Sequence, residues 1–257
     1  MRGVIILTEG RSGSNWLGSL TNSTGKLGKS SEWIDEATSG IDPRKVSSEE
    51  FVAGILKLAS TENGFFSIKL FPRHMHQFQE HYGKDFIKHI CDSHDVLLVS
   101  LTRQDRIGQA ISFSKALQTG AWKSTTGSKR EPVYDFDQIS RCFFMVGRSY
   151  DFWQSYASIT QRTVLNFVYE DLLEDPISWV DEIASFAGIT YSKDSVKSGT
   201  QIQRNSQSEA WRNQFEKEAI AGEFIANTTP SRVPSRNIEN IIRFLRGRHT
   251  KPKPYSS

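Results

Sequence analysis

The fold is decided by the stretch Val4-Ile-Ile-Leu-Thr-Glu-Gly-Arg-Ser-Gly-Ser-Asn-Trp-Leu17. An apolar run of strand length leads into a turn of small residues, and an amphipathic segment follows. The first N–H groups and the positive dipole end of a helix in this position favour a phosphate or a sulfate. The residues that would shape such a site are Gly10, Arg11, Ser12, Gly13 and Ser14. The sequence therefore predicts an anion site directly after the first strand.

The alternation of short apolar runs with longer segments of helical period continues along the chain. Strands are predicted at 4–8, 65–71, 96–102 and 164–169. Helices are predicted at 15–24, 49–59, 74–90, 106–119, 136–158 and 177–187. This order is typical of an α/β fold, and we expect a P-loop-like three-layer sandwich with a central, mainly parallel sheet flanked by helices.

Length and composition fit a soluble globular protein. The 257 residues are 37% hydrophobic and 24% charged, so we expect a single domain over 1–257, with 246–257 as a flexible basic tail. The net charge of +3 is too small for a general nucleic-acid partner. Two cysteines cannot build a disulfide framework, and no metal site is predicted because His74 and His76 would point apart on a helix and are expected at the surface.

Targeting signals are not evident. The apolar run near the start is much shorter than a signal-peptide core or the roughly 20 residues of a membrane span. We therefore expect a cytoplasmic protein without a transmembrane segment, and leave open a peripheral attachment to the membrane.

The nucleotide-hydrolysing P-loop is the first alternative for the loop after the first strand. Its motif needs Gly-Lys and then Ser or Thr, whereas Asn15 and Trp16 stand at the corresponding positions after Gly10. The triphosphate-binding lysine is therefore missing. A nucleotide-dependent kinase or phosphatase on the same scaffold, or a non-catalytic protein that binds a bisphosphate, remain as alternatives.

Four segments resemble, in matching order, the motifs of sulfotransferases that use 3′-phosphoadenosine 5′-phosphosulfate (PAPS). Residues 11–17 are similar to the 5′-phosphosulfate loop, and residues 101–113 are similar to the 3′-phosphate motif. Residues 168–176 resemble a strand-to-helix signature whose role we take as structural, and residues 204–215 resemble a late Arg-rich segment. Further similarity at 24–33 and 118–122 indicates the bacterial trehalose 2-sulfotransferase-like family, which includes lipopolysaccharide and nodulation-factor sulfotransferases.

The resemblance implies that PAPS is the co-substrate and that no metal takes part. The expected acceptor is a hydroxyl of a carbohydrate or glycolipid, and the family also implies a homodimer. The residues expected to bind the donor are Gly10, Arg11, Ser12, Gly13, Ser14, Asn15, Trp16, Arg103, Ser112 and Arg204. Among these, Arg103, Ser112 and Arg204 would hold the 3′-phosphate.

The resemblance also assigns catalytic roles. Glu32 stands where the family has its base, with Asp35 and Glu36 as nearby competitors. Arg11 is expected to stabilise the charge on the leaving phosphate, because a guanidinium makes bidentate contacts with such oxygens. Lys69 is expected beside the phosphosulfate loop, although a plain surface lysine is an equal alternative. The residues expected to bind the acceptor are Glu32, Trp33, Gln118 and Trp122, with a core role as the alternative for Trp33.

Overall fold

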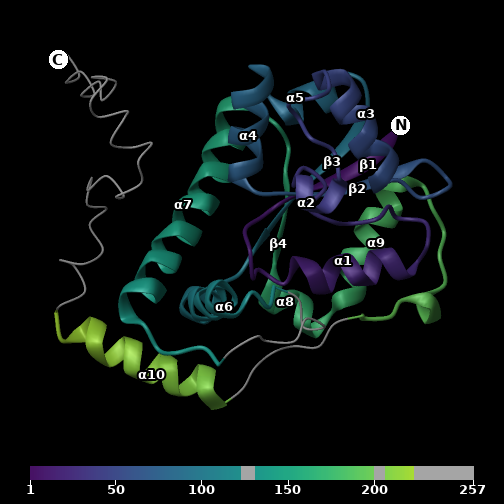
Figure 1. The fold of residues 1–257 in the computed structure, drawn as a ribbon. Helices are drawn as coiled ribbons and strands as arrows, with labels where there is room; N and C mark the ends of the chain where they lie inside the picture. Colours follow the sequence, from purple (N-terminus) through teal and green to yellow (C-terminus); the bar gives the residue numbers. More distant parts are fainter. Residues whose placement is uncertain (123–130, 200–205, 223–257) are drawn as a thin grey trace, which may run out of the picture.

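The computed structural model describes residues 1–122, 131–199 and 206–222, and in these residues four strands form one sheet (Figure 1). The strands are β1 (Arg2–Leu7), β2 (Phe65–Leu70), β3 (Asp95–Thr102) and β4 (Leu165–Val168). Their order is β2-β1-β3-β4, and every pairing is parallel. The chain moves from β1 to one neighbour and then crosses to the other side, so the connections diverge at the carboxyl ends of β1 and β3. Ligands of open parallel sheets bind in such a crevice.

Helices cover both faces of the sheet, because successive side chains of β1 point in opposite directions. Val4 and Ile6 pack with one set of helices, and Ile5 and Leu7 pack with the other. The first set is α1 (Ser14–Ser23), α8 (Tyr169–Glu174) and α9 (Pro176–Ala187). The second set is α3 (Ser48–Ala59), α4 (Pro72–Tyr82), α5 (Phe86–Cys91) and α7 (Phe136–Thr160). The predicted α/β three-layer sandwich is confirmed.

A separate hydrophobic cluster lies beyond the sheet, where α6 (Arg106–Thr119), α7 and α10 (Ser206–Ile220) meet (Figure 1). Trp211 and Phe215 of α10 are buried against α6 and α7. The helix α10 was not predicted, because its sequence is mostly polar and only these two large side chains mark its inner face. This cluster brings the late part of the chain next to the segment that follows β3.

The predicted helix 74–90 is two helices instead of one. Gly83 ends α4 with a left-handed φ of 64°, and the Asp85 carboxylate caps α5 by accepting from the Lys88 N–H at 2.8 Å. The short α2 (Glu36–Ser39) and the 3-10 turn η1 (Lys193–Ser195) were also not predicted.

Three further expectations can be compared with the structure. The predicted basic tail at 246–257 lies outside the described residues. None of the helices in the described part of the chain is long and apolar enough to cross a membrane. The expectation that His74 is a surface residue is wrong, because its side chain is completely buried, whereas His76 is exposed as predicted.

Candidate functional site

The loop between β1 and α1 leaves the N-terminus of α1 without a side-chain cap. Gly13 stands at the N-cap position with a left-handed φ of 95° and, having no side chain, makes no capping hydrogen bond. The first N–H groups of a helix have no acceptor within the helix, so an uncapped end can bind an anion. The hydroxyl-bearing residues Ser12 and Ser14 of this loop are both buried. The geometry is that of an anion-binding turn.

Neighbouring elements hold this loop in shape. The Thr8 hydroxyl lies 2.8 Å from both the Ser12 hydroxyl and the Leu101 carbonyl of β3. On the other side, the Gln109 side-chain amide donates to the Gly10 carbonyl at 2.9 Å. The loop is therefore fixed to β3 and to α6. Gln109 was not foreseen as part of the site.

Arg11 joins the loop to α6. Its backbone is left-handed with a φ of 64°, which is strained for a residue with a side chain. Nε of Arg11 donates to the Ser112 hydroxyl at 2.8 Å, and Nη1 donates to the Trp122 carbonyl at 2.7 Å. The structure thus brings together two of the predicted donor-binding residues and the backbone of Trp122.

A second guanidinium, that of Arg103, follows β3 and lies next to the loop. It donates from Nη1 to the Arg11 carbonyl at 3.3 Å and lies 5.2 Å from the centre of the Tyr169 ring. Its Nε is buried and makes no hydrogen bond among the described residues, but it lies 3.7 Å from Glu170 Oε1 in an ion pair. Burial, and then the like charge of Arg103, lower the pKa of Arg11. An anion bound between the two cations would relieve both effects.

The carboxylate of Asp105 accompanies Arg103. It lies 3.3 Å from Nη2 of Arg103 and also pairs with Arg212 of α10. The Arg212 pair, the hydrogen bond from the Gly108 N–H and the charge of Arg103 lower the pKa of Asp105, although burial opposes them. The late part of the chain therefore reaches the predicted 3′-phosphate region through Arg212. Arg204 itself lies outside the described residues.

Lys69, near the end of β2, connects the first turn of α1 to the predicted base. Its Nζ contacts Asn15 Oδ1 and lies 3.2 Å from Glu32 Oε1. The Lys69 side chain is only 4% exposed, so the alternative of a surface lysine is wrong. The Glu32 side chain is 30% exposed, and its carboxylate therefore remains accessible beside a buried cation.

The position of Glu32 follows from a backbone contact at the edge of the sheet. Ser31 forms a parallel bridge with Ile68, and the Lys69 N–H donates to the Ser31 carbonyl at 2.9 Å. The residue after Ser31 therefore lies beside the end of β2, at the same edge of the sheet as the anion loop.

Arg73, His74 and Asp35 continue the cluster away from the loop. The Arg73 guanidinium pairs with both oxygens of Asp35, at 2.9 and 2.8 Å, and Nη2 lies 3.8 Å from Glu32 Oε2. Burial opposes ionisation of Asp35, but its contacts with His74 and Arg73 lower its pKa to about 2. An acid this strong is a poor proton acceptor near neutral pH. Glu36 is exposed and lies 3.8 Å from Arg44, so the geometry favours Glu32 among the three carboxylates.

The remaining predicted residues have varied surroundings. Trp16 packs edge-on against Tyr169 at 5.9 Å. Trp33 packs against the core and its indole N–H donates to the Lys29 carbonyl at 2.6 Å. The Gln118 amide exchanges two hydrogen bonds with the Val133 backbone and is not part of the Glu32 cluster. Trp122 is 43% exposed, its carbonyl accepts from Arg11, and its ring packs edge-on against Phe113 at 5.4 Å.

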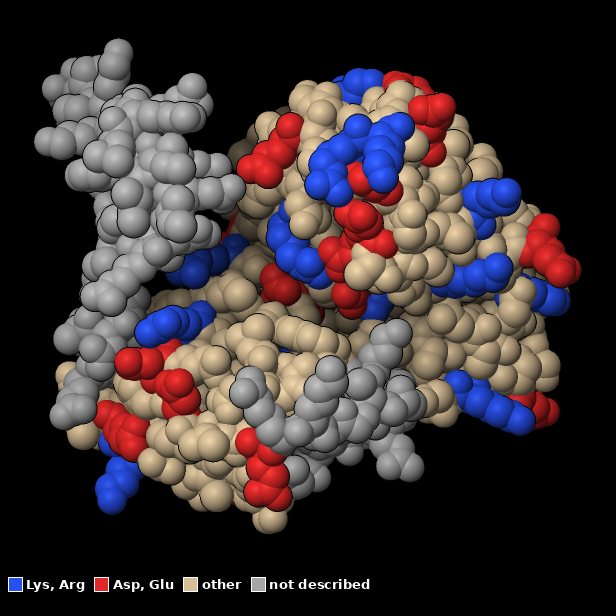
Figure 2. All heavy atoms as spheres, viewed as in Figure 1, with Lys and Arg blue, Asp and Glu red and all other residues tan. Residues whose placement is uncertain are grey.

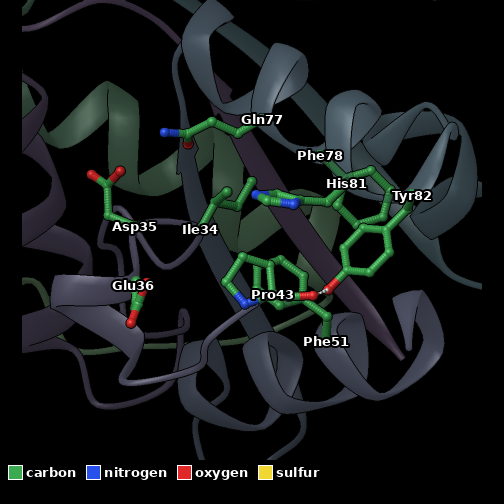
Figure 3. Close-up of a pocket in the computed structure, with 9 residues that line it drawn as sticks. All are labelled: Ile34, Asp35, Glu36, Pro43, Phe51, Gln77, Phe78, His81 and Tyr82. Atoms are coloured by element: carbon green, nitrogen blue, oxygen red, sulfur yellow. Dashed lines mark hydrogen bonds between the residues drawn. The ribbon is translucent and has the colours of Figure 1, made fainter. Parts of the chain in front are cut away.

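A small pocket of about 130 Å³ adjoins Asp35 (Figure 3). Asp35 and Glu36 lie on one side of it, and His81 and Tyr82 lie on the other, with Ile34 between them. The Tyr82 hydroxyl donates to the Pro43 carbonyl at 2.8 Å. On a larger scale, Figure 2 shows that this face of the molecule is hollowed near its centre, where basic and acidic side chains are both visible.

The comparisons with known proteins agree with this geometry. Residues 3–218 match the sequence profile of the Stf0 sulphotransferase family, and the chain belongs to that family. The resemblance found in the sequence is confirmed, and the family indicates an enzyme that transfers a sulfuryl group. No curated protein matches the chain.

A solved structure is also similar to the chain. It is the sulfotransferase domain of the olefin synthase from Synechococcus PCC 7002, with 14% sequence identity and a TM-score of 0.44. The similarity covers 98% of this chain and 96% of that one.

Sequence reasoning missed Arg73 and Gln109. Arg73 comes directly after Phe71-Pro72 at the carboxyl end of β2, and the carboxyl edge of a parallel sheet is where ligand sites lie. This position could have identified Arg73 as a candidate site residue from the sequence. Gln109 gave no signal, because its contact with Gly10 depends on how α6 packs against the loop.

Proposed function

We propose that the protein transfers a sulfuryl group from PAPS to a hydroxyl of a carbohydrate or glycolipid. The observation that carries this proposal is the position of Lys69, whose ammonium contacts Asn15 at the anion loop and Glu32 in the neighbouring cluster. One buried cation therefore connects a site suited to a phosphosulfate with a carboxylate suited to a hydroxyl.

The donor would occupy the loop and the region after β3. The N–H groups at the start of α1, with Ser12 and Ser14, would bind the 5′-phosphosulfate. Arg103 and Ser112, together with Arg204 from outside the described residues, would bind the 3′-phosphate that distinguishes PAPS from ATP. The fit is supported by the start of α1, whose first N–H groups are suited to an anion, and by the pKa of Arg11, which burial and the charge of Arg103 lower and a bound anion would raise.

The chemistry needs a proton acceptor and a stabilised leaving group. As the acceptor oxygen bonds to sulfur, its proton would pass to Glu32, and the bond between sulfur and the 5′-phosphate oxygen would break. Arg11 and Lys69 would stabilise the charge that develops on that phosphate. The products are a sulfate ester and adenosine 3′,5′-bisphosphate, and no step requires a metal.

The acceptor would lie beside the Glu32 carboxylate. Trp33, Gln118 and Trp122 are the side chains proposed to contact it, and Trp122 is the most exposed of the three. We also propose that the protein is cytoplasmic and forms a homodimer. For a glycolipid acceptor, it would attach peripherally to the membrane.

Thermal unfolding with two nucleotides tests the donor part of the proposal. A ligand that binds only the folded protein stabilises it and raises the melting temperature. The stabilisation grows with the logarithm of the ligand concentration once that concentration exceeds Kd. Adenosine 3′,5′-bisphosphate is expected to raise it, and ATP with magnesium is expected to leave it nearly unchanged. A response to ATP alone would favour the kinase or phosphatase. A response to the bisphosphate without sulfation of any sugar would favour a non-catalytic binding protein.

A further inference from the structure

Arg73 lies between two carboxylates and is paired unequally with them. Its Nη2 is 2.8 Å from Asp35 Oδ2 and 3.8 Å from Glu32 Oε2. Its Nη1 donates to the other Asp35 oxygen at 2.9 Å. The guanidinium thus makes its bidentate contact with Asp35 and only a longer ion pair with Glu32, although both carboxylates are within its reach.

The structure also shows why Asp35 holds Arg73. The Phe71 N–H donates to Nδ1 of His74 at 3.1 Å, so the imidazole proton is on Nε2, which faces Asp35 Oδ1 at 3.2 Å. His74 is completely buried and stacks on the Phe71 ring at 5.0 Å, which fixes its orientation. Asp35 is therefore fixed from one side by His74 and pairs with Arg73 on the other.

We infer that Asp35 is a positioning residue that prevents the Arg73 guanidinium from coming within hydrogen-bond distance of the Glu32 carboxylate. This inference rests on the proposed function, in which Glu32 accepts the proton of the acceptor hydroxyl. Glu32 Oε1 is already paired with Lys69, and a close contact of Arg73 with Oε2 would occupy the oxygen that remains for the acceptor. A second close cation would also make the carboxylate a weaker base.

Each charged group around Glu32 affects the ionisation of its carboxylate in a direction that can be stated in advance. Lys69 faces it from β2, Arg73 from α4, and Asp35 lies behind Arg73 in the same loop as Glu32, with the ring of His74 beyond. Removing the Asp35 charge releases Arg73 toward Glu32, which favours the ionised carboxylate. Removing the Arg73 charge has the opposite effect. The loss of a nearby charge produces the same two directions without any movement of Arg73, so the position of Arg73 in the variant decides the inference.

The test compares Asp35→Asn and Arg73→Gln with the wild type in transfer from radiolabelled PAPS to a panel of disaccharides that includes trehalose. The acid limb of the kcat profile should move to lower pH in Asp35→Asn and to higher pH in Arg73→Gln. We also expect kcat of Asp35→Asn near neutral pH to fall by on the order of tenfold, with unchanged affinity for adenosine 3′,5′-bisphosphate. Glu36→Gln is the matched control and should leave the profile in place. Shifts of the same sign, or none, would overturn the inference.

A structural readout keeps the test independent of the acceptor. In a crystal structure of Asp35→Asn, Arg73 should lie within hydrogen-bond distance of Glu32. An Arg73 that stays 3.8 Å away, as it is now, would contradict the inference. If the wild type transfers no sulfuryl group, or if Glu32→Gln is fully active, the proposed function fails, and this crystal structure still decides where Asp35 holds Arg73.

Discussion

The two halves of the site differ in how their cations are held. In the donor region, formed by residues 8–16 with Arg103 and Ser112, Arg11 donates to the Ser112 hydroxyl and the Trp122 carbonyl, and Arg103 pairs with Asp105 and Glu170 of the flanking segments. In the Glu32 cluster, formed by Glu32, Asp35, Lys69, Arg73 and His74, each cation lies against a carboxylate of the cluster itself. The donor region also contains the start of α1, whose first N–H groups are suited to an anion, whereas the Glu32 cluster contains a partly exposed carboxylate suited to a hydroxyl. A transfer from an anionic donor to a sugar requires both.

The largest effect is expected in the Glu32 cluster when Glu32, the proposed catalytic base, is replaced. Glu32→Gln keeps the size of the side chain but removes its ability to accept a proton, so kcat should fall by about 10²- to 10⁴-fold. The melting shift with adenosine 3′,5′-bisphosphate should persist, because the donor region is untouched. Glu36→Gln, a neighbouring exposed carboxylate, should retain activity. Full activity of Glu32→Gln would assign the base to another residue.

The donor region should be the more sensitive of the two to a backbone change. In Gly13→Ala the new Cβ would lie 2.2 Å from the Tyr169 ring at a φ of 95°, so unfolding free energy should fall by about 2–4 kcal/mol. Gly25→Ala is the matched control, because Gly25 also has a positive φ but nothing within 4 Å of the added atom. Urea unfolding of both variants isolates the Tyr169 contact. Equal losses would show that this close packing does not constrain the loop.

Replacing one arginine in each region tests whether the donor is bound by the donor region alone. Arg103→Ala should weaken binding of adenosine 3′,5′-bisphosphate by about 10- to 100-fold, since hydrogen bonds to charged groups contribute about 1.5–3 kcal/mol. Arg73→Ala removes a cation from the Glu32 cluster instead and should leave this affinity unchanged. Isothermal titration calorimetry measures both. Similar losses in the two variants would mean that the donor extends over both regions.

The smallest effect concerns the pH dependence of stability. The folded-state pKa of Asp35, about 2, lies below its ordinary value of 3.8, so Asp35 stabilises the fold above pH 4 and loses this contribution as the pH falls toward 2. Asp35→Asn should therefore be less stable than wild type by about 1–2 kcal/mol at pH 7, with a difference that narrows in acid. Urea unfolding at several pH values measures it. A constant difference would indicate that packing, and not ionisation, stabilises Asp35.

Much of the fold could be predicted from the sequence because local patterns determine it. The strands β1 and β3 could be recognised from their apolar runs alone, and the turn after Leu7 from its small residues. Neither signal depends on contacts with distant parts of the chain. The helix break at Gly83 was missed because a single glycine inside a helical pattern is often tolerated. The amphipathic signal of α10 was too weak, since only Trp211 and Phe215 are buried in it.

The site could be predicted only where residues lie in local motifs. Arg11, Lys69 and Arg103 were expected near one another, and the structure places Arg11 beside Arg103 and Lys69 beside Glu32. The pairing of Arg73 with Asp35 depends on the buried side chain of His74, and such contacts between α4 and the loop before α2 have no spacing rule in the sequence. Long-range polar contacts of this kind are visible only in three dimensions.

The most direct test of the proposed function is transfer of radiolabelled sulfur from PAPS to a panel of saccharides and glycolipids, run with wild type and Glu32→Gln in parallel. The account predicts a labelled sugar sulfate and adenosine 3′,5′-bisphosphate in equal amounts with the wild type, and at least a hundredfold less of both with the variant. Labelled product at the same rate with both proteins would contradict the account.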